Sequence, residues 1–266
     1  MKLGLCIEMV FTDISFADRL QKAADSGFKY CEMWFMDMSF KGKPEELGRI
    51  AQKNNITITN TVISAPDGSI GGSLTNPCDR SRWLERAKAT LDFNKAAGID
   101  AAVVCTGNVI SGLSNEQMRQ SVVDGLKFII DMAHKYEITL LLEALNTTYD
   151  HPGYFLTGSY QAACICREIN SEYMKVLFDC YHMQIMEGDI IKHIERNIDV
   201  IGHFHAAGVP GRNEIYLGEL NYSQIISKIC KLGYNGIFAL EYNPTVDPVS
   251  SLAQSVKCLN AGMVDF

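Results

Sequence analysis

Short apolar runs alternate along the chain with longer segments in which apolar residues recur every three or four positions. One such segment carries Met118, Val122, Leu126, Ile129 and Ala133 on a single stripe, which predicts a helix packed against a sheet. The short apolar runs are typical of strands buried on both faces, as in parallel sheets covered by helices. We predict eight strands, at residues 3–7, 30–34, 57–62, 101–105, 139–142, 175–178, 200–204 and 236–240.

The junctions between these segments carry helix and turn signals. Three helical segments end in a glycine that leads into a strand: Gly27, Gly98 and Gly233. Glycine accepts the left-handed conformation found just past a helix, and Asn55 suits the same purpose before residue 57. Ser114 and Gln117 have the spacing of a capping box, which predicts a helix start. Helix therefore leads into strand repeatedly.

Eight buried strands separated by helices predict a closed barrel. At 266 residues the chain suits one such barrel, so we expect a single α/β domain, a (β/α)8 TIM barrel, over residues 1–266. The alternative is a doubly wound open sheet, which normally carries a Gly-x-Gly-x-x-Gly turn after its first strand. Here the first predicted strand is followed by residues 8–13, which contain no glycine. We interpret the glycine-rich segment 67–73 as a flexible active-site loop.

Composition and charge indicate which kinds of molecule the protein is able to bind. The net charge of −7, from 24 basic and 31 acidic residues, opposes binding to nucleic acid. No stretch approaches the roughly 20 apolar residues of a membrane span, and the first apolar run is too short for a signal peptide. Most of the nine cysteines lie in apolar runs, so we interpret them as reduced thiols. We expect a cytoplasmic protein that acts on a small molecule.

Four successive predicted strands end in a residue that can bind a metal. These residues are Glu143, Asp179, His205 and Glu241. Any one acidic residue after a strand is often a helix cap, but the carboxyl ends of all barrel strands meet on the face that holds the active site. Carboxylate oxygens and one imidazole nitrogen suit Mn²⁺, Mg²⁺ or Co²⁺, with Zn²⁺ as a further candidate. The pattern predicts a site for one divalent metal ion.

Other residues near these strand ends are candidates for binding a substrate. His182 lies one short turn beyond the second ligand and can bond a substrate oxygen. Arg212, in a Pro-Gly-Arg turn, can hold a carboxylate or a phosphate. We also assign Asn108 and Trp34 to substrate binding. For His203 two interpretations stay open: it supports the metal ligands, or it is an imidazole of the barrel interior.

At these residues the chain resembles the hydroxypyruvate isomerase family, within the xylose-isomerase-like group of sugar isomerases and epimerases. The matching stretches are 9–13, 142–147, 151–156, 179–189, 202–205, 210–212, 218–221 and 240–242. The resemblance implies that Glu143 and Glu241 are the paired acid/base carboxylates, that Asp179 and His205 complete the metal shell, and that the protein forms dimers or tetramers. Some family members carry glutamine in place of His205, whereas ketose 3-epimerases carry histidine.

We therefore expect a metal-dependent isomerase. It would move a proton between adjacent carbons of a small hydroxy-carbonyl acid, of the hydroxypyruvate or 2-oxo-tetronate type, through an enediolate. The alternative is a ketose 3-epimerase that acts on an uncharged sugar or a sugar phosphate. An abasic-site endonuclease is more distant, because it would need more histidine ligands for a multi-zinc cluster and a basic groove, and the six histidines and the net charge of −7 disfavour both. A non-catalytic sugar-binding protein is a further distant alternative.

Overall fold

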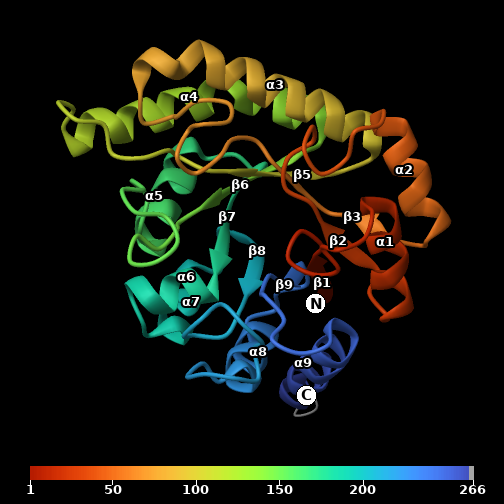
Figure 1. Ribbon diagram of the computed structural model, residues 1–266. Helices are drawn as coiled ribbons and strands as arrows, with labels where there is room; N and C mark the ends of the chain where they lie inside the picture. The colour runs from red at the N-terminus through yellow and green to blue at the C-terminus, as the bar shows by residue number, and fades with distance from the viewer. Residues whose placement is uncertain (264–266) are drawn as a thin grey trace.

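The computed structural model describes residues 1–263, and these form one curled sheet of nine parallel strand segments (Figure 1). Along the sheet the order is β3-β2-β1-β9-β8-β7-β6-β5-β4. The strands are Lys2–Cys6 (β1), Tyr30–Glu32 (β2), Thr57–Ile58 (β3), Thr61–Val62 (β4), Ala101–Val104 (β5), Thr139–Glu143 (β6), Met174–Asp179 (β7), Ile201–Ala206 (β8) and Ile237–Leu240 (β9). All eight predicted strands are therefore found.

The predicted strand at residues 57–62 is divided into β3 and β4. The first piece pairs with β2 and the second with β5. Backbone hydrogen bonds continue across the division: the N–H of Met33 donates to the carbonyl of Asn60 (3.3 Å), and that of Val62 donates to Trp34 (2.7 Å). The two pieces thus occupy the place of one strand, and we call each of the eight strand positions of the barrel a stave. Because β3 pairs with β2 and β4 pairs with β5, the sheet closes into a barrel of eight staves. The closed barrel excludes the open doubly wound sheet.

Helices lie outside the ring of strands (Figure 1). They are Phe16–Asp25 (α1), Pro44–Lys53 (α2), Arg80–Ala97 (α3), Asn115–Tyr136 (α4), Ser159–Ile169 (α5), Cys180–Met186 (α6), Ile190–Asn197 (α7), Tyr222–Lys231 (α8) and Pro248–Met263 (α9), with a 3-10 turn, Pro77–Asp79 (η1), before α3. The capping box of Ser114 and Gln117 is present, and Gly98 and Asn55 have the expected positive φ, 76° and 55°. Within residues 1–263, no helix is both long and apolar enough to cross a membrane.

The inward faces of the strands carry the residues that build the site. Val103, Leu141 and Leu177 form a small apolar cluster separate from the large core between strands and helices. Because side chains alternate along a strand, Glu143 shares the face of Leu141, and Asp179 shares the face of Leu177. The barrel therefore turns both carboxyl groups inward at the carboxyl ends of their strands.

Candidate metal centre and active site

The four predicted ligands come together at the carboxyl end of the barrel. Strand register sets Asp179 opposite His205, so the ends of β7 and β8 lie level, and it sets Glu143 opposite Leu177, two residues before Asp179. Glu241 follows the last residue of β9. All four side chains are buried, and one ligand atom from each lies within 4.8 Å of the others. The barrel thus gathers three carboxyl groups and one imidazole from four neighbouring staves.

The donor atoms at this point fit a divalent cation. His205 Nδ1 is buried and has no hydrogen-bond partner among the described residues. It lies 3.3 Å from Glu241 Oε2, 3.6 Å from Glu143 Oε1 and 4.0 Å from Asp179 Oδ2. Asp179 Oδ1 accepts hydrogen bonds from the first turn of α6, which leaves Oδ2 directed to the cluster. Oxygen ligands with one imidazole nitrogen are a set that Mn²⁺, Mg²⁺, Co²⁺ and Zn²⁺ accept.

Glu32, at the end of β2, orients the imidazole ligand. Its two oxygens lie 2.5 Å from His203 Nε2 and 2.8 Å from His205 Nε2. These are hydrogen-bonding distances, so we interpret the three residues as a support rather than as a second metal site. The bond places a proton on His205 Nε2 and leaves Nδ1 to the ligand cluster. His203 is thus a buried imidazole of the barrel interior that contacts the same carboxylate as the candidate ligand His205.

The two candidate acid/base carboxyl groups differ in proton affinity. Burial raises the pKa of Glu143 to about 7, against the opposing effect of His205. Burial acts in the same direction on Glu241, but the positive charges of His205 and Arg212 hold its pKa well below the usual range. Such a separation lets one carboxyl group carry a proton while the other stays ionised.

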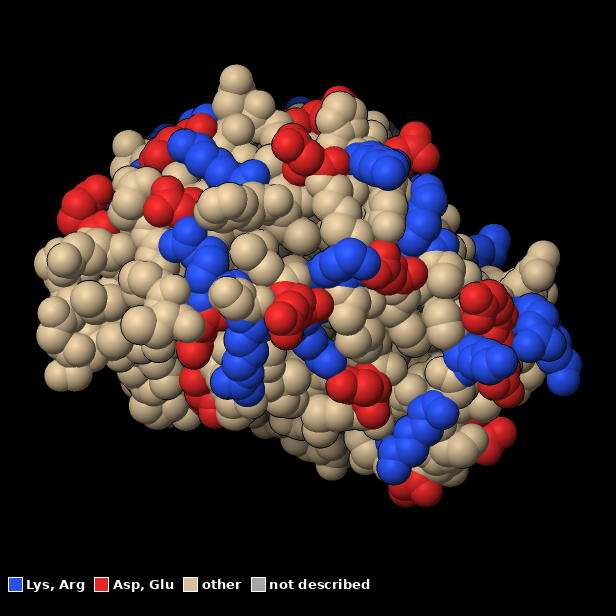
Figure 2. Space-filling model, turned by 90° about the horizontal axis from the view of Figure 1, so that it is seen from above, with Lys and Arg blue, Asp and Glu red and all other residues tan. Residues whose placement is uncertain are grey.

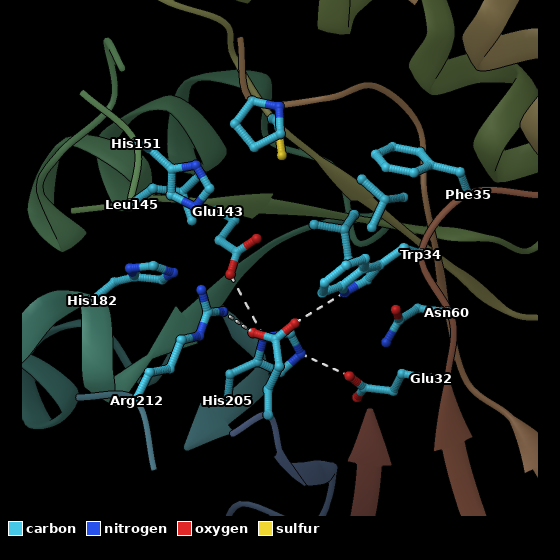
Figure 3. A pocket seen from close by; sticks show the side chains of 15 residues that line it. Glu32, Trp34, Phe35, Asn60, Glu143, Leu145, His151, His182, His205 and Arg212 are labelled. Carbon is cyan, nitrogen blue, oxygen red and sulfur yellow. Dashed lines mark hydrogen bonds and ion pairs between the residues drawn. The ribbon is translucent and has the colours of Figure 1, made fainter. Parts of the chain in front are cut away.

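A cavity of about 190 Å³ opens beside the cluster and contains three of the four predicted substrate-binding residues: Trp34, His182 and Arg212 (Figure 3). Trp34 Nε1 donates to Glu241 Oε1 at 3.2 Å. Arg212 Nη2 donates to Glu241 Oε2 at 2.6 Å, while its Nε is buried without a partner. The cavity wall therefore presents N–H donors directly beside the carboxyl groups.

Asn108 is the predicted residue that the structure does not bring to the cavity. After β5 the chain turns away at Gly107, whose φ is +101°, and Asn108 pairs through its backbone with Tyr154 in the loop that follows β6. Its carbonyl accepts a hydrogen bond from Thr75. Asn108 is thus a loop residue outside the cavity lining.

Some residues of the site were missed by sequence reasoning. Glu32 is the last residue of β2, so it lies at a strand end like the four candidate ligands. It was missed because the predicted strand extended to residue 34. Asn60, in the division of the third stave, and His151, in the loop after β6, also line the cavity. Asn60 has no sequence signal, because its place depends on the path of a turn, whereas His151 lies in the stretch 151–156 that carries the family resemblance.

Comparisons with known proteins agree with this architecture. The family described as "Xylose isomerase-like TIM barrel" matches residues 20–261. The 2-oxo-tetronate isomerase of Cupriavidus necator is 32% identical, over 90% of this chain and 91% of that protein. The hydroxypyruvate isomerase of Escherichia coli is 31% identical, over 92% and 94%. A Brucella melitensis structure described as an AP endonuclease of family 2 superposes with a TM-score of 0.89 at 26% identity, over 96% of this chain and 98% of that one. The chain therefore belongs to the xylose isomerase-like TIM barrel family, and its curated relatives place it among the isomerases of that family.

Proposed function

We propose that the protein is a metal-dependent isomerase of small hydroxy-carbonyl acids, of the hydroxypyruvate or 2-oxo-tetronate type. The observation that carries the proposal is the pair of buried carboxyl groups, Glu143 and Glu241, whose proton affinities differ and which flank one cation site beside a small cavity. The names of the relatives at 31% and 32% identity support the same substrate class.

Each residue of the cluster has a distinct part in the proposed reaction. Glu143, Asp179, His205 and Glu241 would hold the ion. Such an ion supplies positive charge that stabilises the negative charge developing on the substrate oxygens. One of the two glutamates removes a proton from the hydroxyl-bearing carbon, and the other returns a proton to the former carbonyl carbon. A second proton passes between the two oxygens, so the product is an isomer of the substrate.

Arg212 and His182 are the proposed contacts to the substrate. The Nε of Arg212 and the Nε2 of His182 are both buried and lack a hydrogen-bond partner within residues 1–263. A carboxylate or a hydroxyl oxygen in the cavity would satisfy both donors. This arrangement supports an acid substrate, because the guanidinium is the permanent positive charge in the cavity lining.

The decisive experiment compares substrates. After chelation and addition of Mn²⁺ or Mg²⁺, we expect turnover of hydroxypyruvate or a 2-oxo-tetronate, and little turnover of uncharged ketoses. A clear preference for an uncharged ketose would support the alternative 3-epimerase, in which a proton leaves and returns on opposite faces of the same carbon. Protein left without added metal is the control.

Replacement of either glutamate tests the acid/base assignment. Glu143→Gln or Glu241→Gln keeps the shape of the side chain but cannot carry a proton, so we expect kcat to fall by about 10²- to 10⁴-fold at saturating metal. Glu45→Gln, an exposed glutamate of α2, is the matched control. Near-normal kcat in either test variant would remove that residue from the mechanism.

A nuclease function has weaker support despite the description of the Brucella structure. Nucleic acid binding requires many lysines and arginines on one surface. The chain carries a net charge of −7, and on the face in Figure 2 acidic and basic side chains are interspersed. Pairs such as Lys88 with Asp92, four residues apart on α3, neutralise one another.

A further inference from the structure

Asn146, three residues beyond the end of β6, is fully buried, and its amide makes four hydrogen bonds. Its Nδ2 lies 2.7 Å from His182 Nδ1 and donates to Asp150 Oδ2 at 2.6 Å. Its Oδ1 accepts from the backbone N–H groups of Tyr149 (3.0 Å) and Asp150 (3.2 Å). Every polar atom of this side chain is therefore occupied, and none of them reaches the cavity.

The contacts of Asn146 determine the tautomer of His182. The backbone N–H of Asn146 also faces His182 Nδ1, at 3.3 Å. Nδ1 thus meets two N–H donors and has to act as an acceptor, so the proton of the neutral ring resides on Nε2. That nitrogen is buried without a hydrogen-bond partner, 3.6 Å from Asp179 Oδ2, and the ring borders the cavity (Figure 3).

Asp150 extends the same network to Arg212. Its Oδ2 accepts from both Asn146 Nδ2 and the Tyr181 hydroxyl (2.8 Å), and its Oδ1 lies 3.5 Å from Arg212 Nη1. The Arg212 guanidinium also stacks over the Tyr181 ring, 5.3 Å from its centroid. One turn after β6 therefore contacts both His182 and Arg212 from outside the cavity.

We propose that Asn146 is a positioning residue that fixes His182 as a neutral Nε2–H donor and, through Asp150, holds Arg212 beside it. The two donors then face the oxygen atoms at one end of the substrate. The assignment of that end to a carboxylate rests on the proposed function, whereas the tautomer of His182 does not. His182 in this state donates a hydrogen bond and cannot accept a proton at Nε2. Proton transfer is left to Glu143 and Glu241.

The tautomer is measured directly by NMR of protein labelled with ¹⁵N-histidine, without substrate. We expect His182 to show an unprotonated Nδ1 and a protonated Nε2, with its signals assigned by their loss in His182→Gln. A protonated Nδ1 with an unprotonated Nε2 would overturn the proposal. This measurement stays decisive if the wild-type protein fails to convert hydroxypyruvate, an outcome that would refute only the proposed function.

Replacement of the amide tests the positioning role. In Asn146→Ala we expect kcat/KM to fall about 10- to 100-fold through misplaced donors, while the affinity for Mn²⁺ changes by less than about threefold. The His182 nitrogen signals should move toward each other as both tautomers become populated. The matched control is Asn94→Ala, which removes a buried amide whose two hydrogen-bond partners, Thr61 and Ala101, are outside the cavity lining. Unchanged kcat/KM in a folded Asn146→Ala protein would overturn the proposal.

A second variant keeps the proposal testable if Asn146→Ala does not fold. Asp150→Asn keeps the shape of the side chain but removes the negative charge beside Arg212. We expect KM to rise about tenfold while the His182 tautomer stays as in wild type, because Asn146 still faces Nδ1. In the proposal Asn146 sets the His182 tautomer and Asp150 holds Arg212. A change of the His182 tautomer in Asp150→Asn without a change of KM would contradict these roles.

Discussion

Glu32 controls the imidazole ligand through one carboxylate shared with His203. In Glu32→Ala the Nε2 of His205 loses its acceptor, so the ring can rotate or exchange tautomers. We expect the affinity for Mn²⁺ to fall about 10- to 100-fold, the range found when the hydrogen-bond partner of a metal ligand is removed. Binding is measured from the EPR signal of free Mn²⁺. An affinity equal to that of wild type, in a folded variant, would remove Glu32 from the metal centre.

The same carboxylate predicts a dependence of stability on pH in the metal-free protein. Burial acts to raise the pKa of Glu32, but the charges of His205 and His203 lower it to about 2 in the folded state. The unfolded chain, with an ordinary pKa near 4.5, binds the proton first as pH falls. The stabilisation is therefore complete above pH 4.5 and is lost progressively toward pH 2. Urea unfolding from pH 6 to pH 3 should show a steeper fall in the free energy of unfolding for wild type than for Glu32→Gln.

The strand-end rule predicted the four residues that the structure brings together as candidate ligands, but not the residues that contact them. Glu143, Asp179, His205 and Glu241 follow from topology alone, since parallel strands end on one face. Glu32 lies 171 positions from His203, and the bond between them depends on how two side chains meet inside the barrel. Asn108, by contrast, was predicted beside the substrate but is outside the cavity lining, in the loop that turns at Gly107. The pattern of apolar and polar residues therefore does not predict the conformations of the loops.

At the scale of elements, the loop that follows β8 is hydrogen-bonded to the loop that follows β9. Glu214 is fully buried and accepts three hydrogen bonds, from Thr245 N (2.8 Å), Thr245 Oγ1 (2.9 Å) and Ser251 Oγ (3.0 Å). The backbone N–H of Asn243 also donates to the carbonyl of Arg212 (2.8 Å). These bonds connect the loop that carries Arg212 to the loop that carries Glu241.

Removal of this buried carboxylate should loosen Arg212. In Glu214→Ala the donors of Thr245 and Ser251 lose their acceptor, so we expect the free energy of unfolding to fall by about 1–3 kcal/mol. KM should rise as Arg212 loses its fixed position, with Mn²⁺ affinity nearly unchanged. Urea unfolding and steady-state kinetics measure the two effects. Glu219→Ala, an exposed glutamate of the same loop, is the control, and equal effects in both variants would contradict this role.

The periodic patterns predicted the elements well because the helices bury one face and the strands are buried on both faces. The third stave is the exception. Thr59 and Asn60 are buried, yet they separate β3 from β4 along the chain. The run at residues 57–62 reads as one continuous strand, because the division depends on two different neighbours, β2 and β5, rather than on the residues themselves. The missed Asn60 lies at this division and lines the cavity.

At the scale of the whole molecule, the candidate metal centre connects four of the eight staves. Strands β6, β7, β8 and β9 each bring one candidate ligand, and the unfolded chain has no such arrangement. A ligand that binds only the native state stabilises it by about 2.7 kcal/mol at a concentration of 100 times Kd. For a domain of this size, that corresponds to a rise in Tm of about 5–10 °C.

This coupling predicts the response of the full protein to metal removal and return. After chelation, Mn²⁺ at a hundredfold excess over its Kd should raise Tm by this amount in a calorimetric scan. Asp179→Asn keeps the Oδ1 cap of α6 but weakens the ligand oxygen, so the rise should shrink markedly at the same Mn²⁺ concentration. An equal rise in both proteins would mean that the ion binds elsewhere. The four candidate ligands lie far apart in sequence and come together only in the folded barrel. The full rise in Tm on addition of Mn²⁺ therefore requires the folded barrel.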